Sequence, residues 1–168
     1  MMDANYTPPN AAVDDPPRTP ARLWRQMLAI ALAFIVDVIG TEVLGAALGN
    51  TYVQLAGGVS RGTLERFAED VSTYDNPWGI ANFIIGSGMS VLGGYLCVKL
   101  AWQREWRCVA WLCVVHVGYS FWRVWPVTIE WWESNAITLG SVLIGAALTR
   151  GGQRRAARLS SVRALANE

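Results

Sequence analysis

Hydrophobic residues gather into four long stretches, which polar segments separate along the chain. The stretches cover about residues 23–48, 78–101, 106–125 and 131–149. Each has roughly 19 to 26 residues, and about 20 residues are needed to cross the hydrocarbon core of a bilayer as a helix. Helices are expected because lipid offers no partner to free backbone groups. The pattern predicts an all-α integral membrane protein, a bundle of four transmembrane helices within residues 22–149.

The polar segments differ in character. Residues 1–21 hold five prolines and few large apolar side chains, which predicts a disordered tail. Residues 150–168 form a basic tail with five arginines. Two interpretations of this tail stay open, a short helix on an anionic membrane surface and a disordered segment. In the outer loop, residues 50–77, Leu64, Phe67 and Val71 recur at helical spacing and predict a short amphipathic helix over about 62–71.

The distribution of positive charge predicts the orientation. With the amino terminus in the cytoplasm, eleven of the 14 Lys and Arg residues lie in cytoplasmic parts, and Arg61, Arg66 and Arg123 lie outside. Both termini are therefore expected in the cytoplasm, and this pattern in so small a protein fits a bacterial inner membrane. The alternative, that the first stretch is a cleaved signal peptide, is disfavoured because about twenty mostly polar residues precede it.

Composition supports a membrane location and argues against several functions. Hydrophobic residues make up 52% of the chain and charged residues only 16%, against about 25% in soluble domains. The nine tryptophans suit the membrane–water interface. Cys97, Cys108 and Cys113 form no C-x-x-C pair, and with one histidine we expect neither a metal site nor a cofactor. No basic stripe with interleaved aromatic residues points to nucleic acid.

Asp37 is the leading functional candidate, because a carboxylate at bilayer depth costs about 2.5 to 3.5 kcal/mol on insertion scales. Glu42 lies five residues outward of it, about 7.5 Å along a helix, and Arg123 lies seven residues outward of His116, about 10.5 Å. These depths permit Asp37 to face His116 and Glu42 to face Arg123. Two interpretations stay open: a pair that exchanges protons, or a polar clamp that only ties helices together.

Small residues recur every four positions in or beside three of the stretches, the fourth stretch contributing Ser141 and Gly145. One series is Gly86, Ser90 and Gly94, and another is Gly45 and Gly49. Such faces let helix backbones approach closely in lipid. The spacing does not separate contacts within the chain from contacts in an oligomer, so a second copy or another membrane protein is a candidate partner beside the lipid bilayer.

The segment Asp37-Val-Ile-Gly-Thr41 resembles the first-helix motif of small multidrug resistance transporters, in which a glutamate precedes Val-Ile-Gly-Thr. That resemblance implies that Asp37 exchanges protons for a cation within a four-helix protein. The chain departs from the family in its aspartate, its long polar amino-terminal segment and its outer loop, and its second and third stretches show no matching pattern.

Two functions follow from these observations. The first is a non-enzymatic membrane subunit or scaffold that associates through its glycine faces. The alternative is a small proton-coupled transporter with Asp37 as the coupling carboxylate. We expect no enzyme, because the chain lacks a paired acid motif, a metal-binding triad and a serine nucleophile near its one histidine.

Overall fold

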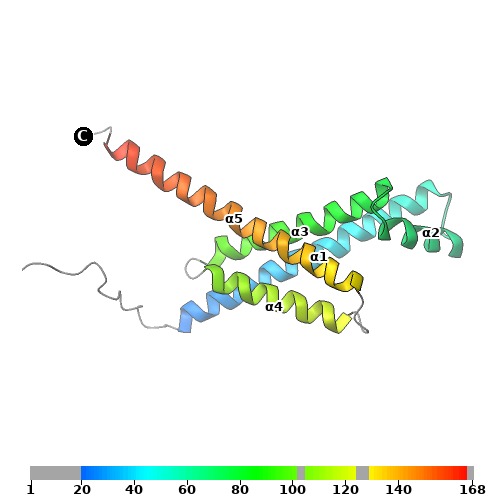
Figure 1. The fold of residues 1–168 in the computed structure, drawn as a ribbon, viewed down its shortest axis with the longest axis horizontal. Helices are drawn as coiled ribbons and strands as arrows, with labels where there is room; N and C mark the ends of the chain where they lie inside the picture. The colour runs from blue at the N-terminus through cyan, green and yellow to red at the C-terminus, as the bar shows by residue number, and fades with distance from the viewer. Residues whose placement is uncertain (1–19, 102–104, 124–128, 166–168) are drawn as a thin grey trace, which may run out of the picture.

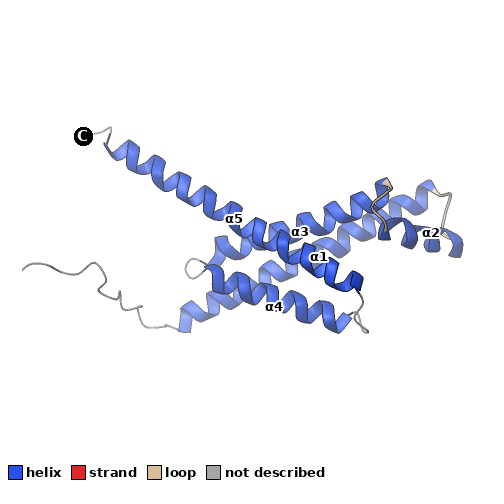
Figure 2. Cartoon of the chain, viewed as in Figure 1, coloured by secondary structure: helices blue, strands red, loops and turns tan. Residues whose placement is uncertain are grey.

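The computed structural model describes residues 20–101, 105–123 and 129–165, and these residues form five helices and no strand (Figure 2). The helices are α1 (Pro20–Leu55), α2 (Arg61–Ser72), α3 (Pro77–Ala101), α4 (Glu105–Arg123) and α5 (Ile129–Leu165). The fold is therefore all-α, as predicted. The tail predicted for residues 1–21 lies outside the described residues up to residue 19, as do residues 124 and 125 of the third stretch.

Four long helices form the bundle, and α2 lies at one end of it (Figure 1). α3 packs most extensively against α1 and α5, and α4 packs against α1, α3 and α5. The apolar core takes one fully buried side chain from each long helix: Ala33 of α1, Cys97 of α3, Leu112 of α4 and Val142 of α5. The second half of α5 projects away from the bundle (Figure 1).

Two helix bounds differ from the prediction. α1 continues seven residues past Leu48 to Leu55, because Asn50 and Thr51 do not stop a helix. It ends before Gly57 and Gly58, whose positive φ angles of 83° and 126° suit glycine and reverse the chain. α5 continues through the basic segment instead of ending at Thr149.

The short helix predicted over 62–71 is found as α2. Ser60 caps it, because its hydroxyl oxygen accepts a hydrogen bond of 3.1 Å from the backbone N–H of Thr63. Tyr52 of α1 donates a hydrogen bond of 2.8 Å to Asp70, and its ring lies 5.1 Å from that of Phe67. These contacts hold α2 against the carboxy-terminal end of α1.

The glycine faces serve mainly to pack helices of the same chain. A Cβ atom at Gly94 of α3 would overlap the backbone of Val142 in α5, and one at Gly145 of α5 would overlap the backbone of Val91 in α3. Gly49 packs against Phe67, whereas Gly45 and Gly86 have no such neighbour within 4 Å. The backbones of α3 and α5 therefore approach closely at both Gly94 and Gly145.

Two helices, α1 over Leu23–Leu55 and α3 over Pro77–Ala101, are long and apolar enough to cross a membrane. Among the described residues, α4 and α5 have no stretch that is apolar enough over the length of a membrane span. Arg107, His116 and Arg123 lower the hydropathy of α4. Four spans therefore stay a prediction.

The α3–α5 contact can be tested with Gly94→Ala. We expect a loss of about 1 to 3 kcal/mol, because the added methyl forces the two backbones apart. In the matched control Gly118→Ala, the new methyl meets nothing within 4 Å, and helix propensity favours it by up to about 1 kcal/mol. The melting temperatures of both variants can be measured with a thiol-reactive dye, because heating exposes the buried Cys97 and Cys108. Equal melting temperatures for the two variants would contradict the close approach.

Candidate functional site

Asp37 and His116 meet inside the bundle, where α1 passes α4. Nε2 of His116 lies 2.9 Å from Oδ2 of Asp37, which is an ion-pair distance. Both residues are buried, with 3% of Asp37 and 7% of His116 exposed. The ring N–H is not aimed closely enough at the carboxylate to form a hydrogen bond, so these two atoms lack a hydrogen-bond partner among the described residues. The two groups therefore lie at ion-pair distance without a hydrogen bond between them.

A third helix supplies a hydroxyl to the same carboxylate. Ser90 of α3 donates a hydrogen bond of 3.1 Å to Oδ1 of Asp37. Gly93 lies beside this contact, and a Cβ atom there would be 3.3 Å from Cβ of Asp37. The small residues of α3 therefore bring its backbone close enough for Ser90 to reach the acid. The sequence marked Ser90 only as a packing residue, although its helical spacing also placed a hydroxyl at bilayer depth.

We call the direction toward the amino-terminal ends of α1 and α4 inward, and the opposite direction outward. Aromatic and apolar side chains close the inner side of the pair. The ring of Phe34 lies 5.1 Å from that of His116 and 5.4 Å from that of Tyr119, both edge to face. Ala33 and Leu112 are fully buried one turn inward of Asp37 and His116, respectively. An apolar environment strengthens the attraction between the two polar groups, because water does not screen it.

A second ion pair joins the same two helices further outward. The guanidinium of Arg123 in α4 donates to a carboxylate oxygen of Glu42 in α1, and the hydroxyl of Tyr119 lies 3.5 Å from that guanidinium. Both charged side chains are about half exposed. The two pairings that the helix depths permit are therefore both present, one buried and one at the surface.

A polar cavity of about 250 Å³ connects the two pairs. Its walls come from all four long helices, and eleven of its thirteen lining residues have polar side chains: Asp37, Thr41, Glu42, Ser90, His116, Tyr119, Ser120, Arg123, Ser134, Asn135 and Thr138, with Val38 and Gly86. The cavity has room for several water molecules. Because Glu42 and Arg123 are half exposed, it leads from the surface of the bundle to the buried acid.

The contribution of α5 was missed in the sequence. Asn135 is buried and donates to the Ser120 hydroxyl at 3.0 Å and to the Trp131 carbonyl at 2.8 Å. An amide inside an apolar stretch was the available signal. A metal centre has no support, because no group of three or more His, Cys, Asp or Glu side chains gathers within the described ranges.

Comparisons with known proteins add no further constraint. No protein-family model, curated protein or solved structure matches the chain. The resemblance of the segment from Asp37 to Thr41 to a transporter motif thus has no support beyond those five residues. The function must be argued from the cavity and its two ion pairs.

The two ion pairs should differ in their effect on stability. We expect His116→Ala to cost about 3 to 5 kcal/mol, because it leaves the carboxylate of Asp37 buried without its partner. Glu42→Gln is the control in the exposed pair, and we expect it to cost about 0 to 1 kcal/mol. Adding Asp37→Asn to His116→Ala should restore part of the loss. Chemical denaturation of the detergent-solubilised protein measures all three, and equal losses for the two single variants would contradict the assignment.

Proposed function

We propose that the chain is a small multi-pass membrane protein that exchanges protons for a small cation at Asp37. In this proposal α1, α3, α4 and the first part of α5 cross the bilayer. Large apolar side chains around the bundle support a lipid environment, because many are exposed in the isolated chain, including Ile39, Val43, Ile84, Val114 and Ile144. Only 17% of the apolar window of α1 and 28% of that of α3 are buried, unlike the core helices of soluble proteins.

The tryptophans support spans through α4 as well. Trp106 and Trp122 are exposed near opposite ends of α4. Sixteen residues separate them, which is about 24 Å along a helix and close to the roughly 30 Å of a hydrocarbon core. Exposed Trp24 and Trp132 lie near the inner end of α1 and the outer end of α5. Tryptophans at these two depths suit the two membrane–water interfaces, where this residue is enriched.

The polar cavity is the observation that carries the exchange function. It links the half-exposed Glu42–Arg123 pair to the buried Asp37–His116 pair. Its walls hold two carboxylates, the groups that attract a cation, beside one guanidinium and one imidazole. The fully buried core inward of Asp37 closes the other side. A site that is open to one side only can exchange a proton for a ligand without a continuous leak.

The membrane subunit or scaffold is the second candidate. Its main support was the glycine series of α3, but Gly94 is occupied by the backbone of α5 in the same chain. Gly45 of α1 keeps an open face and is the remaining small-residue contact point for a partner helix. The cavity has no role in this alternative, so we rank it below cation exchange.

The proposed topology predicts where labels will be accessible. Single cysteines at Arg66 and Gly152, in a variant that lacks the three native thiols, should react with an impermeant maleimide from opposite sides of the membrane. Arg66 lies in α2 at the outer end, and Gly152 lies past the apolar part of α5. Labelling of intact cells and of inverted vesicles distinguishes the sides. Labelling of both positions from the same side would contradict four spans with cytoplasmic termini.

Proton-linked exchange can be measured in proteoliposomes that contain a pH-sensitive dye. External addition of small cations, from sodium to tetramethylammonium, should drive protons out of vesicles with the wild-type chain. We expect Asp37→Asn to reduce this flux at least about tenfold, because it removes the only buried carboxylate of the cavity walls, a change of about 1.4 kcal/mol or more. Gly118→Ala, outside the cavity, is the control and should keep it.

Two results would contradict the proposal. One is a folded wild-type chain that moves no protons with any cation of the series. The other is Asp37→Asn that lowers the melting temperature but leaves the flux unchanged, which would favour the structural clamp.

A further inference from the structure

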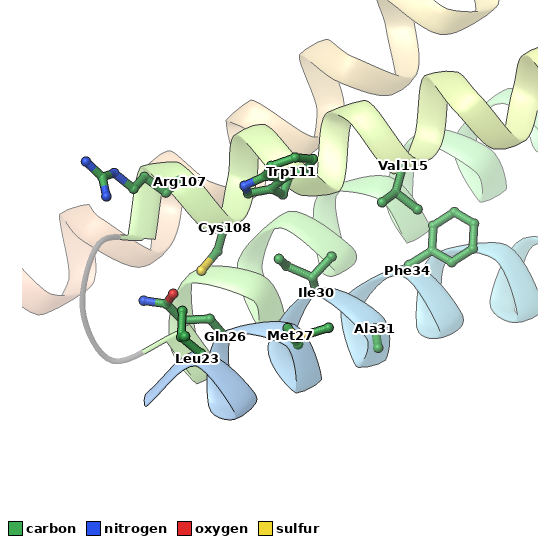
Figure 3. Close-up of a pocket in the computed structure, with 10 residues that line it drawn as sticks. All are labelled: Leu23, Gln26, Met27, Ile30, Ala31, Phe34, Arg107, Cys108, Trp111 and Val115. Atoms are coloured by element: carbon green, nitrogen blue, oxygen red, sulfur yellow. The ribbon is translucent and has the colours of Figure 1, made fainter. Parts of the chain in front are cut away.

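A second and larger cavity, of about 610 Å³, lies between α1 and α4 on the inner side of the Asp37–His116 pair (Figure 3). We call it the inner groove. Its walls are mainly aliphatic and aromatic, and they run from Leu23 to Phe34 along α1 and from Arg107 to Val115 along α4. Trp111 lines it and is largely exposed. The groove therefore differs from the polar cavity in both depth and chemistry.

The length of the inner groove decides which kind of molecule fits it. Leu23 and Phe34 are eleven residues apart, which is about 16 Å along a helix. That is half of a hydrocarbon core of about 30 Å, the depth of one leaflet. A transmembrane helix needs a surface about 20 residues long. Further outward the rings of Phe34, His116 and Tyr119 fill the space between α1 and α4. The groove matches one acyl chain in length, and it is too short to cover a whole transmembrane helix.

The polar end of the groove indicates the charge of the head group. Arg107 is exposed and lies at the same end as Leu23 and Gln26 (Figure 3). Within the described part of the chain, no carboxylate forms an ion pair with Arg107. An arginine at the inner headgroup level attracts anionic lipid, at about 1 kcal/mol for each such cation.

We propose that the inner groove binds one acyl chain of an anionic phospholipid from the cytoplasmic leaflet, with the lipid phosphate at Arg107. The terminal part of the acyl chain lies against Phe34, whose ring also contacts His116. Lipid in the groove thus holds the ring that closes the inner side of the proton-exchanging pair. The inference rests on the membrane location proposed above, but not on proton exchange.

The test uses the full chain in zwitterionic vesicles with a few per cent of an anionic phospholipid that carries a photoreactive group on its acyl chain. After illumination, mass spectrometry should locate the label on the α1 and α4 segments that line the groove. Ala31→Trp fills the groove and should reduce labelling about tenfold. The control Ala47→Trp, at an exposed alanine of α1 outside the groove, should leave it unchanged.

The charge is tested with the same lipid and a zwitterionic analogue. Arg107→Gln should reduce the preference for the anionic probe about fivefold, the factor that corresponds to one cation at the membrane surface. Arg25→Gln, at an exposed arginine outside the groove lining, should not. Melting temperatures close to wild type show that each variant is folded.

The outcomes separate the two proposals. If the chain does not float with the vesicles, the membrane location fails and the lipid site fails with it. Should it float but label evenly along α1, α3 and α4, or label with Ala31→Trp as wild type does, only the lipid site is overturned. Equal labelling by the two probes overturns the role of Arg107.

Discussion

The contact between Asp37 and His116 is the constraint on which the arrangement of the bundle depends. A carboxylate buried without a partner is far more costly than any single apolar contact is favourable, so its helix must rotate and shift until a partner is in reach. This requirement fixes the register of α1 against α4. Once that register is set, Glu42 falls beside Arg123 further along both helices, and Phe34 falls beside the imidazole ring.

Close backbone packing on the other side of α3 completes the polar centre. Gly94 lets α3 lie against α5, while Gly93 lets it lie against α1. Ser90, one turn from Gly94, then reaches the acid from a helix that has no charged group at that depth. Small residues and buried polar groups therefore act together: the first determine how near the helices come, and the second determine how they are rotated.

Much of this could be predicted from the sequence. Apolar stretches predicted the long helices, period-3.6 spacing of Leu64, Phe67 and Val71 predicted α2, and residue depth permitted both ion pairs. The cavity and the share of Asn135 in it could not be predicted, because they depend on the rotation and tilt of α5, which arise from packing across the whole bundle. The end of α1 was not predicted either. The apolar pattern placed it at Leu48, but Asn50 breaks a helix only weakly, and α1 ends just before the turn at Gly57 and Gly58.

Phe34 lies between two compartments of opposite polarity, the inner groove on one side and the Asp37–His116 pair on the other. Its phenyl ring, together with the fully buried Ala33 and Leu112, forms the boundary between these two spaces. In the proposed membrane orientation, a much smaller side chain at this position would weaken that boundary on the side of the cytoplasmic leaflet. Insulation of the acid from the cell interior would then rely in part on the bulk of a residue that carries no charge and donates no hydrogen bond.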